Sequence, residues 1–185
     1  MAEHVCPWWL GYLLASPVRR LWHKPEEILA PYVKSGMTVL EMGPGMGYFT
    51  LPMARLVGEK GLIICPDVQE KMLRSLVRRA KRAGLEKRIV ARLAATDSLN
   101  IADYNGKVDF ALAFAVVHEV PNEESLFREI YQSMKPGARL FISEPKGHVS
   151  SDAFNEMLTS AKQVGFMEVS SPAIKRSLTA LLKKV

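Results

Sequence analysis

Three glycines at alternate positions follow an acidic residue in the stretch VLEMGPGMGYFT, residues 39–50. The glycines are Gly43, Gly45 and Gly47, and the acidic residue is Glu41. Glycine adopts backbone conformations that are closed to other residues, and without a side chain it lets a ligand approach the main chain. If a strand precedes this turn and a helix follows it, the N–H groups that open the helix suit an anionic group such as a carboxylate. The stretch therefore predicts a ligand-binding loop.

Two classes of ligand compete for this loop. A nicotinamide enzyme would carry Gly-x-Gly-x-x-Gly, with the pyrophosphate resting on the helix N-terminus. Here the spacing is Gly-x-Gly-x-Gly, and Tyr48 occupies the place of the third glycine. Glu41 would repel a diphosphate but attract an ammonium or a sulfonium group. The pattern favours a positively charged cofactor.

The elements that must hold this loop alternate regularly along the chain. Strands that read as continuous Val, Ile, Leu and Phe are typical of a parallel sheet buried on both faces, with helices on each side. This is an α/β doubly wound pattern, in which ligands bind beyond the carboxyl ends of the strands. The predicted strands are 37–42, 62–65, 89–93, 108–114, 138–143 and 166–170, and the predicted helices are 49–57, 69–83, 123–134 and 150–164. Pro136-Gly137 is expected to stop the third helix, and Gly165 the last one.

The size and cysteine content of the chain limit its organisation. Its 185 residues, 48% of them hydrophobic, predict one domain over 1–185, with residues 1–30 as the only appendage. Cys6 and Cys65 cannot build a disulfide framework or a four-ligand zinc site, so we expect no metal and a reducing, cytoplasmic setting. No apolar run reaches the ~18 residues that cross a bilayer, which predicts a soluble protein without a transmembrane segment.

The net charge of +6 raises the question of a nucleic-acid partner. Residues 71–92 hold nine Lys and Arg against one Glu. The apolar residues of this segment recur at helical spacing, with most of the basic ones on the opposite side; the apolar residues are Met72, Leu73, Leu76, Val77 and Ala80. Because no aromatic residues are interleaved for stacking on bases, a solvated helix face is favoured over an RNA surface, and no nucleic-acid partner is expected.

At this point the sequence resembles a known family. The run from Glu41 to Gly47 resembles the E/D-x-G-x-G-x-G signature of class I S-adenosylmethionine-dependent methyltransferases. Asp67, in IICPDVQEKML, stands where that family has an acidic residue binding both ribose hydroxyls, and a carboxylate with two oxygens matches a vicinal diol. Residues 108–146 are similar to the family's fourth strand, following loop, helix, turn and fifth strand. The resemblance spans residues 25–185 and is closest to the quinone-biosynthesis subgroup.

The resemblance implies S-adenosylmethionine as cofactor, with S-adenosylhomocysteine as product. The implied cofactor-binding residues are Glu41, Gly43, Pro44, Gly45, Gly47, Asp67, Val68, Asp97, Ser98 and Phe114. Relatives place an Asp on the adenine amino group after the third strand, whereas LAATDSLNI has Ala95 at the matching site and Asp97 two residues later. Asp97 or the neighbouring backbone would take that contact; alternatively, Asp97 and Ser98 cap a short helix.

The resemblance also implies how the sheet ends. RSLTALLKK favours a helix on propensity alone. In the family this segment is the last strand of a β-hairpin and runs antiparallel in the sheet. We therefore expect a strand over 175–183 and a Rossmann-like, seven-stranded, mostly parallel sheet with an antiparallel last strand.

The implied reaction is methyl transfer to a small, apolar or aromatic acceptor. His118, in FAVVHEVP, would face the methyl end of the cofactor and could take a proton at neutral pH, because an unperturbed histidine has a pKa near ~6.5. Alternatively it packs under the adenosine or bonds a loop carbonyl.

Further polar and aromatic residues are candidates for the acceptor pocket. Those expected to line it are Trp8, Trp9, Tyr12, Glu119, Glu144 and His148. Residues 1–30 would form a lid over the acceptor, and a membrane-surface contact or a piece of the core are the alternatives for their aromatic patch. Other readings remain open: Glu119 braces the loop before Pro121, and the segment around His148 begins a helix through a cap near Ser150. A protein that binds the cofactor without catalysing any transfer is the alternative function.

Overall fold

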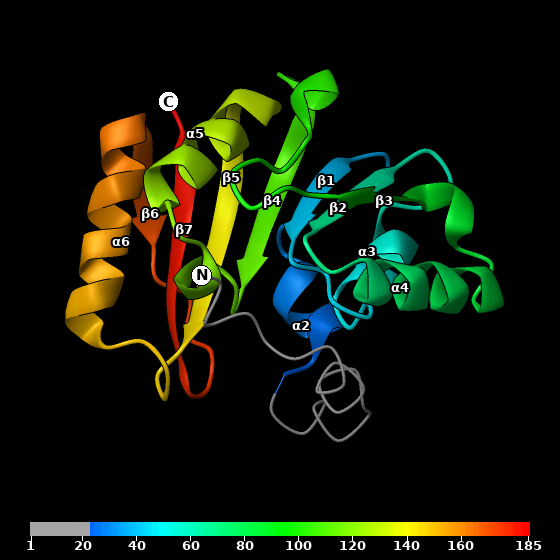
Figure 1. Ribbon diagram of the computed structural model, residues 1–185, viewed down its shortest axis with the longest axis horizontal. Helices are drawn as coiled ribbons and strands as arrows, with labels where there is room; N and C mark the ends of the chain where they lie inside the picture. The colour runs from blue at the N-terminus through cyan, green and yellow to red at the C-terminus, as the bar shows by residue number, and fades with distance from the viewer. Residues whose placement is uncertain (1–22) are drawn as a thin grey trace. The chain divides into compact units, whose positions relative to one another are not determined.

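The computed structural model describes residues 23–185. The chain divides into two compact units, residues 1–94 and 95–185 (Figure 1). The predictions for Cys6, Trp8, Trp9 and Tyr12 lie outside the described residues.

In the first unit, helices alternate with parallel strands. The elements are α2 (Pro25–Leu29), β1 (Thr38–Met42), α3 (Thr50–Leu56), β2 (Leu62–Asp67), α4 (Glu70–Arg82), a short 3-10 turn (Glu86–Arg88) and β3 (Ile89–Leu93). Strand β2 pairs in parallel with β1 on one side and with β3 on the other. All but the first residue of β1 and of β2 are buried, as their continuous apolar sequences predict.

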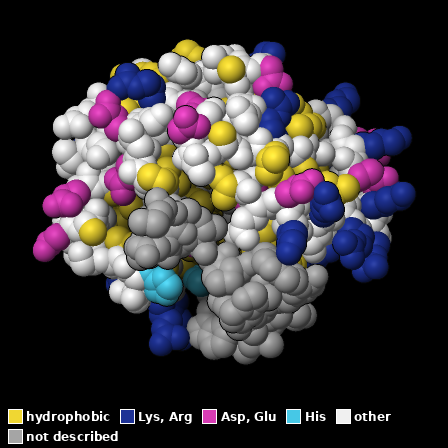
Figure 2. All heavy atoms as spheres, viewed as in Figure 1, with side chains coloured by type: hydrophobic (Ala, Val, Ile, Leu, Met, Phe, Trp, Pro, Cys, Tyr) yellow, Lys and Arg dark blue, Asp and Glu magenta, His cyan; other side chains and the backbone are white. Residues whose placement is uncertain are grey.

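Helix α4 covers this half of the sheet with one apolar face. Four of its five predicted apolar positions are buried, but Val77 is 46% exposed, so the prediction was wrong there. Val77 follows Leu76 directly, and one residue rotates a side chain about 100° around a helix, off the buried face. Exposed Lys and Arg side chains occupy the other face, and Figure 2 shows them (dark blue) gathered over this part of the unit.

In the second unit, parallel strands are followed by an antiparallel hairpin. The elements are a 3-10 turn (Ala102–Tyr104), β4 (Val108–Phe114), η4 (Val117–Glu119), α5 (Glu123–Ser133), β5 (Met134–Pro145), α6 (Ser151–Val164), β6 (Phe166–Ser170) and β7 (Ser177–Lys184). Strands β4 and β5 are parallel, whereas β7 runs antiparallel to both β5 and β6.

The strand order is β3-β2-β1-β4-β5-β7-β6, a seven-stranded sheet. This confirms the predicted Rossmann-like α/β fold with an antiparallel last strand. The last segment forms strand β7, as the family resemblance implied, and not the helix that propensity alone favours. Thr179 to Leu182 of this strand are all buried. Burial in a sheet here outweighs a weak intrinsic preference.

Strand β5 starts earlier than expected. Pro136-Gly137 does not separate the helix from the strand, because β5 already begins at Met134. The register with β4 jumps there: Val108 pairs with Met134, but Phe110 pairs with Arg139. The Pro-Gly pair therefore lies in a bulge, where proline's missing N–H costs no ladder hydrogen bond.

Across the described chain, none of the helices combines the length and the apolar character that a membrane span requires.

Candidate functional site

The glycine loop joins the carboxyl end of β1 to α3, as predicted. Gly43, Gly45 and Gly47 all have positive φ, so the loop depends on conformations that glycine adopts without strain. The Gly43 N–H donates to the carbonyl of Pro66 at 3.1 Å, and the Gly47 N–H donates to that of Pro44 at 2.9 Å. Both ends of the loop are thus tied by backbone hydrogen bonds.

Asp67, the last residue of β2, holds the middle of this loop. Its Oδ2 accepts the Gly45 N–H at 3.2 Å, and its Oδ1 accepts the Gln69 N–H at 2.8 Å. Burial raises the pKa of this carboxyl, and the two backbone hydrogen bonds oppose that rise. Because each carboxylate oxygen has two lone pairs, Asp67 keeps one acceptor position on each oxygen for a further donor.

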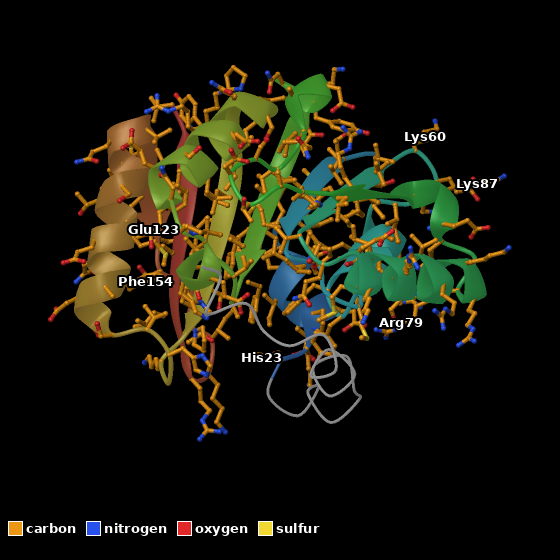
Figure 3. All side chains as sticks on the ribbon, in the orientation of Figure 1. His23, Lys60, Arg79, Lys87, Glu123 and Phe154 are labelled. Atoms are coloured by element: carbon orange, nitrogen blue, oxygen red, sulfur yellow. The ribbon has the colours of Figure 1, made fainter. Side chains whose placement is uncertain are left out.

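Two side chains of helix α4 contact the glycine loop. The Arg79 guanidinium, labelled in Figure 3, donates to the carbonyl of Met46 at 2.5 Å. Leu76, three residues earlier on the same helix, lies so close to Gly47 that a Cβ there would stand 2.5 Å from its Cδ1. Most basic residues of this segment were expected on the solvated face, but Arg79 is half-buried, and burial lowers its pKa. Its spacing of three from Leu76 was the only signal of this contact.

The space beside Gly45 is open to a ligand, whereas the space beside Gly47 is filled by a neighbouring side chain. A Cβ at Gly45 would meet nothing within 4 Å, whereas one at Gly47 would overlap Leu76. Val68, beside Asp67, is 45% exposed, although it is apolar. Open main chain, a diol-matching carboxylate and an exposed apolar side chain fit the tail, ribose and base of S-adenosylmethionine. Glu41 supplies a buried acidic group on β1.

In the second unit, the segment around Asp97 and Ser98 is organised by α5. Glu129 Oε2 accepts hydrogen bonds from Ser98 Oγ at 3.2 Å and from the Leu99 N–H at 3.0 Å. Asp97 is exposed. The next turn, Ala102–Tyr104, has no side-chain cap, so Asp97 and Ser98 do not act as its cap.

His118 lies just beyond the carboxyl end of β4, and its partner is Glu144 near the end of β5. The His118 Nδ1 is 2.5 Å from Glu144 Oε2. Glu144 Oε1 accepts the N–H of Val116 at 3.2 Å and that of Val117 at 2.8 Å. The hydrogen bond from Glu144 raises the pKa of His118; burial opposes this rise, and the charges of Glu144 and Glu119 add to it.

Of the remaining predicted residues of this unit, His148 and Glu119 interact with His118. The His148 ring lies edge-on to that of His118, with ring centroids 5.8 Å apart. Glu119 ends η4, and Phe114 ends β4. The Ser150 side chain caps α6 by accepting the Ala153 N–H at 3.1 Å, as the cap reading predicted. The side chain of Glu144, which the sequence also suggested for the acceptor pocket, is completely buried against His118.

Comparison with known proteins identifies the family. The family model "Methyltransferase domain" matches residues 33–183. The chain is 30% identical over 132 residues to the ubiquinone/menaquinone biosynthesis C-methyltransferase UbiE of Klebsiella pneumoniae, covering 71% of this chain and 51% of the relative. UbiE of Escherichia coli matches over the same length with the same identity. The chain thus spans about half the length of these relatives.

Solved structures share the whole fold. A SAM-dependent methyltransferase from Aquifex aeolicus aligns with a TM-score of 0.87 and 25% identity, over 98% of this chain and all of the other. A putative S-adenosyl-L-methionine-dependent methyltransferase from Methanococcus maripaludis aligns with a TM-score of 0.78 and 14% identity, over 100% of this chain and 97% of the other, which shows the fold alone. From its glycine loop, its sheet order and these matches, the chain belongs to the class I S-adenosylmethionine-dependent methyltransferases.

Proposed function

We propose that this protein transfers a methyl group from S-adenosylmethionine to a small aromatic acceptor that carries an ionisable hydroxyl group. The observation that carries the proposal is the pair of Asp67 and Gly45: a buried carboxylate that keeps an acceptor position on each oxygen, bonded to main chain with open space beside it. The resemblance to C-methyltransferases of quinone biosynthesis supports an aromatic acceptor.

Each group of the first unit has one task in this proposal. S-adenosylmethionine, when bound, supplies an electrophilic methyl group on a positively charged sulfur. Asp67 accepts hydrogen bonds from the ribose hydroxyls, and the loop from Gly43 to Gly47 lies against the amino-acid tail. Glu41 provides negative charge for the cationic part of the cofactor. Val68 lies against the base.

The second unit contributes the remaining groups. Asp97, Ser98 and Phe114 also contact the cofactor, and His118 accepts the proton that the acceptor loses. Glu119 and His148 lie beside the acceptor. Holding donor and acceptor in line supplies much of the rate in such a reaction.

We also propose that residues 1–185 form one methyltransferase domain; most of the segment expected to cover the acceptor, residues 1–30, lies outside the described residues. The family match over 33–183, which runs through both compact units, supports a single domain. The buried free thiol of Cys65 supports a reducing, cytoplasmic setting.

The test uses the full chain with S-adenosylhomocysteine and S-adenosylmethionine. Calorimetry should show binding that Asp67→Ala and Gly45→Val abolish, and intact affinity in both variants would remove the proposed site. Turnover is followed as S-adenosylhomocysteine released with a panel of quinols, phenols, thiols and trivalent arsenic compounds. Binding with no turnover on any acceptor would favour the alternative, a protein that binds the cofactor but is catalytically silent.

A further inference from the structure

Glu144 is a fully buried carboxylate that forms hydrogen bonds with one short segment, residues 116–118. Its side chain is 0% exposed. Burying a carboxylate costs several kcal/mol unless hydrogen bonds compensate for the lost hydration. The compensation comes from residues 116–118: two backbone N–H groups on Oε1 and the imidazole on Oε2. The Glu144 carboxylate therefore holds this segment and the His118 ring in place.

We propose that Glu144 is the positioning residue of the reaction: it fixes the proton of neutral His118 on Nδ1 and so presents Nε2 as the proton acceptor. The proposal deepens the proposed function and rests on it. Glu144 acts through His118 and does not itself contact the acceptor.

The hydrogen-bond pattern determines which ring nitrogen is basic. Oε1 already accepts two N–H groups, so it carries no proton, and two such bonds favour the ionised carboxylate. Oε2 therefore accepts, and Nδ1 must donate to it. In a neutral imidazole one nitrogen donates and the other accepts, so the lone pair lies on Nε2. The ring keeps 21% of its surface exposed although its partner is fully buried.

The same arrangement makes His118 a stronger base. When Nε2 takes a proton, the imidazolium is stabilised across a 2.5 Å contact with a carboxylate. Glu119 on the same segment adds negative charge. Glu123, at the start of α5 and labelled in Figure 3, interacts electrostatically with Glu144. His148 contacts the ring edge-on from the loop before α6.

Backbone strain just before the segment supports a functional role. Ala115 has φ of 56°, a left-handed conformation that costs a residue with a Cβ about 1–2 kcal/mol. Its N–H remains bonded to the Ser143 carbonyl at 2.7 Å, so β4 and β5 stay paired up to the turn. Directly afterwards, the N–H groups of Val116 and Val117 converge on Glu144. Strain that persists in this way is typical of functional sites.

The inferred role of His118 as a base limits which class of substrate can accept the methyl group. The methyl–sulfur bond breaks with its electron pair going to sulfur, the methyl group bonds to the acceptor oxygen or ring carbon, and the acceptor's proton moves to Nε2. A phenol or hydroquinone needs this proton removal near neutral pH, because its hydroxyl is mostly un-ionised there. A trivalent arsenic compound has a free lone pair and does not need it.

Nitrogen NMR of the histidine rings tests the tautomer without any turnover. Spectra of the full chain labelled with ¹⁵N, with the His118→Ala variant to assign the signals, should show neutral His118 protonated on Nδ1 and a pKa above the ordinary value. A wild-type His118 protonated on Nε2 would overturn the proposal by itself, whether or not any variant folds.

Glu144→Gln gives the opposite expectation. The amide oxygen should take the place of Oε1 and accept the two backbone N–H groups, so the amide NH₂ faces Nδ1 and donates to it. The proton of neutral His118 then moves to Nε2, and its pKa falls. Glu123→Gln, which removes a neighbouring carboxylate without a contact to His118, should leave the tautomer unchanged. A Glu144→Gln protein with an unchanged tautomer and pKa would contradict the inference.

Kinetics then separate positioning from a structural effect. On a phenolic acceptor, Glu144→Gln and His118→Ala should each lower kcat by about 10²- to 10⁴-fold, the usual contribution of a general base. The double variant should lose no more than His118→Ala alone, because both changes remove one effect. S-adenosylhomocysteine affinity should stay within twofold. Losses that multiply in the double variant would refute the coupling. If the wild type turns over nothing, the proposed function fails, and the NMR result still decides the role of Glu144.

Discussion

Alanine at Gly45 and at Gly47 should separate ligand approach from folding. The two glycines are two residues apart and both have positive φ, +55° at Gly45 and +87° at Gly47. Their surroundings differ: a Cβ at Gly45 would meet open space, whereas a Cβ at Gly47 would stand 2.5 Å from Leu76 Cδ1. Leu76 is fully buried, so it has little room to move away.

The structure sets the size of each effect. A left-handed alanine costs about 1–2 kcal/mol, offset by about 0.4–1 kcal/mol because alanine restricts the unfolded chain more than glycine does. Gly45→Ala should therefore lower the free energy of unfolding by about 1 kcal/mol. Gly47→Ala adds a steric overlap in a packed core, typically about 1–3 kcal/mol, for a total of about 2–4 kcal/mol.

Urea unfolding and calorimetry measure the two consequences separately. Gly47→Ala should show the larger loss of unfolding free energy, and adding Leu76→Ala should cost about 1–3 kcal/mol less than the two single losses together. Gly45→Ala should stay folded but bind S-adenosylhomocysteine at least tenfold more weakly, because its methyl group occupies the space open to the ligand. Equal stability of the two variants would refute the packing argument, and wild-type affinity in Gly45→Ala would refute ligand approach at that residue.

Two further predictions concern charged groups in the two units. Burial raises the pKa of Asp67 above its ordinary value of 3.8, so its ionised form is lost at a higher pH than in an exposed Asp; calorimetry should show S-adenosylhomocysteine affinity falling as pH drops towards that raised pKa, and affinity constant down to pH ~4 would contradict this. Lys184 Nζ donates to the carbonyls of Tyr131 at 2.7 Å and Met134 at 2.8 Å. Lys184→Met should lower the unfolding free energy by about 1–3 kcal/mol, while exposed Lys183→Met should change it by less than about 0.5 kcal/mol; similar losses in both would remove the role of the two hydrogen bonds.

The structural features that local composition determines could be predicted from the sequence. The glycine loop and the buried strands β1 and β2 follow from local composition, since only glycine accepts positive φ freely and only double burial demands a continuous apolar strand. Strand β7 followed only from family resemblance, because RSLTALLKK has the composition of a helix and its burial is decided by neighbours distant in sequence.

Hydrogen bonds from a side chain to backbone groups far away in the sequence could not be predicted. Arg79 bonds a carbonyl 33 residues earlier, and Glu144 bonds amides 27 and 28 residues earlier. Apart from its spacing of three from Leu76, nothing local separates Arg79 from the other basic residues of α4. Nothing local separates a buried Glu144 from one that lines a pocket. A charged residue that closes an apolar strand, as in FISEP, was the only sign that Glu144 has a special environment.

The cost of the Glu144 arrangement argues against a silent cofactor-binding protein. The proposed cofactor contacts, from the glycine loop and Asp67 to Asp97, Ser98 and Phe114, include neither Glu144 nor His118. A stable second unit does not require a buried carboxylate, since apolar residues of similar volume in place of buried charges are often neutral or stabilising by about 1–4 kcal/mol. Nor does it require left-handed alanine at position 115, where glycine would remove the strain. Neither cost has a purpose if His118 accepts no proton. Because both occur next to His118, they support turnover over binding alone.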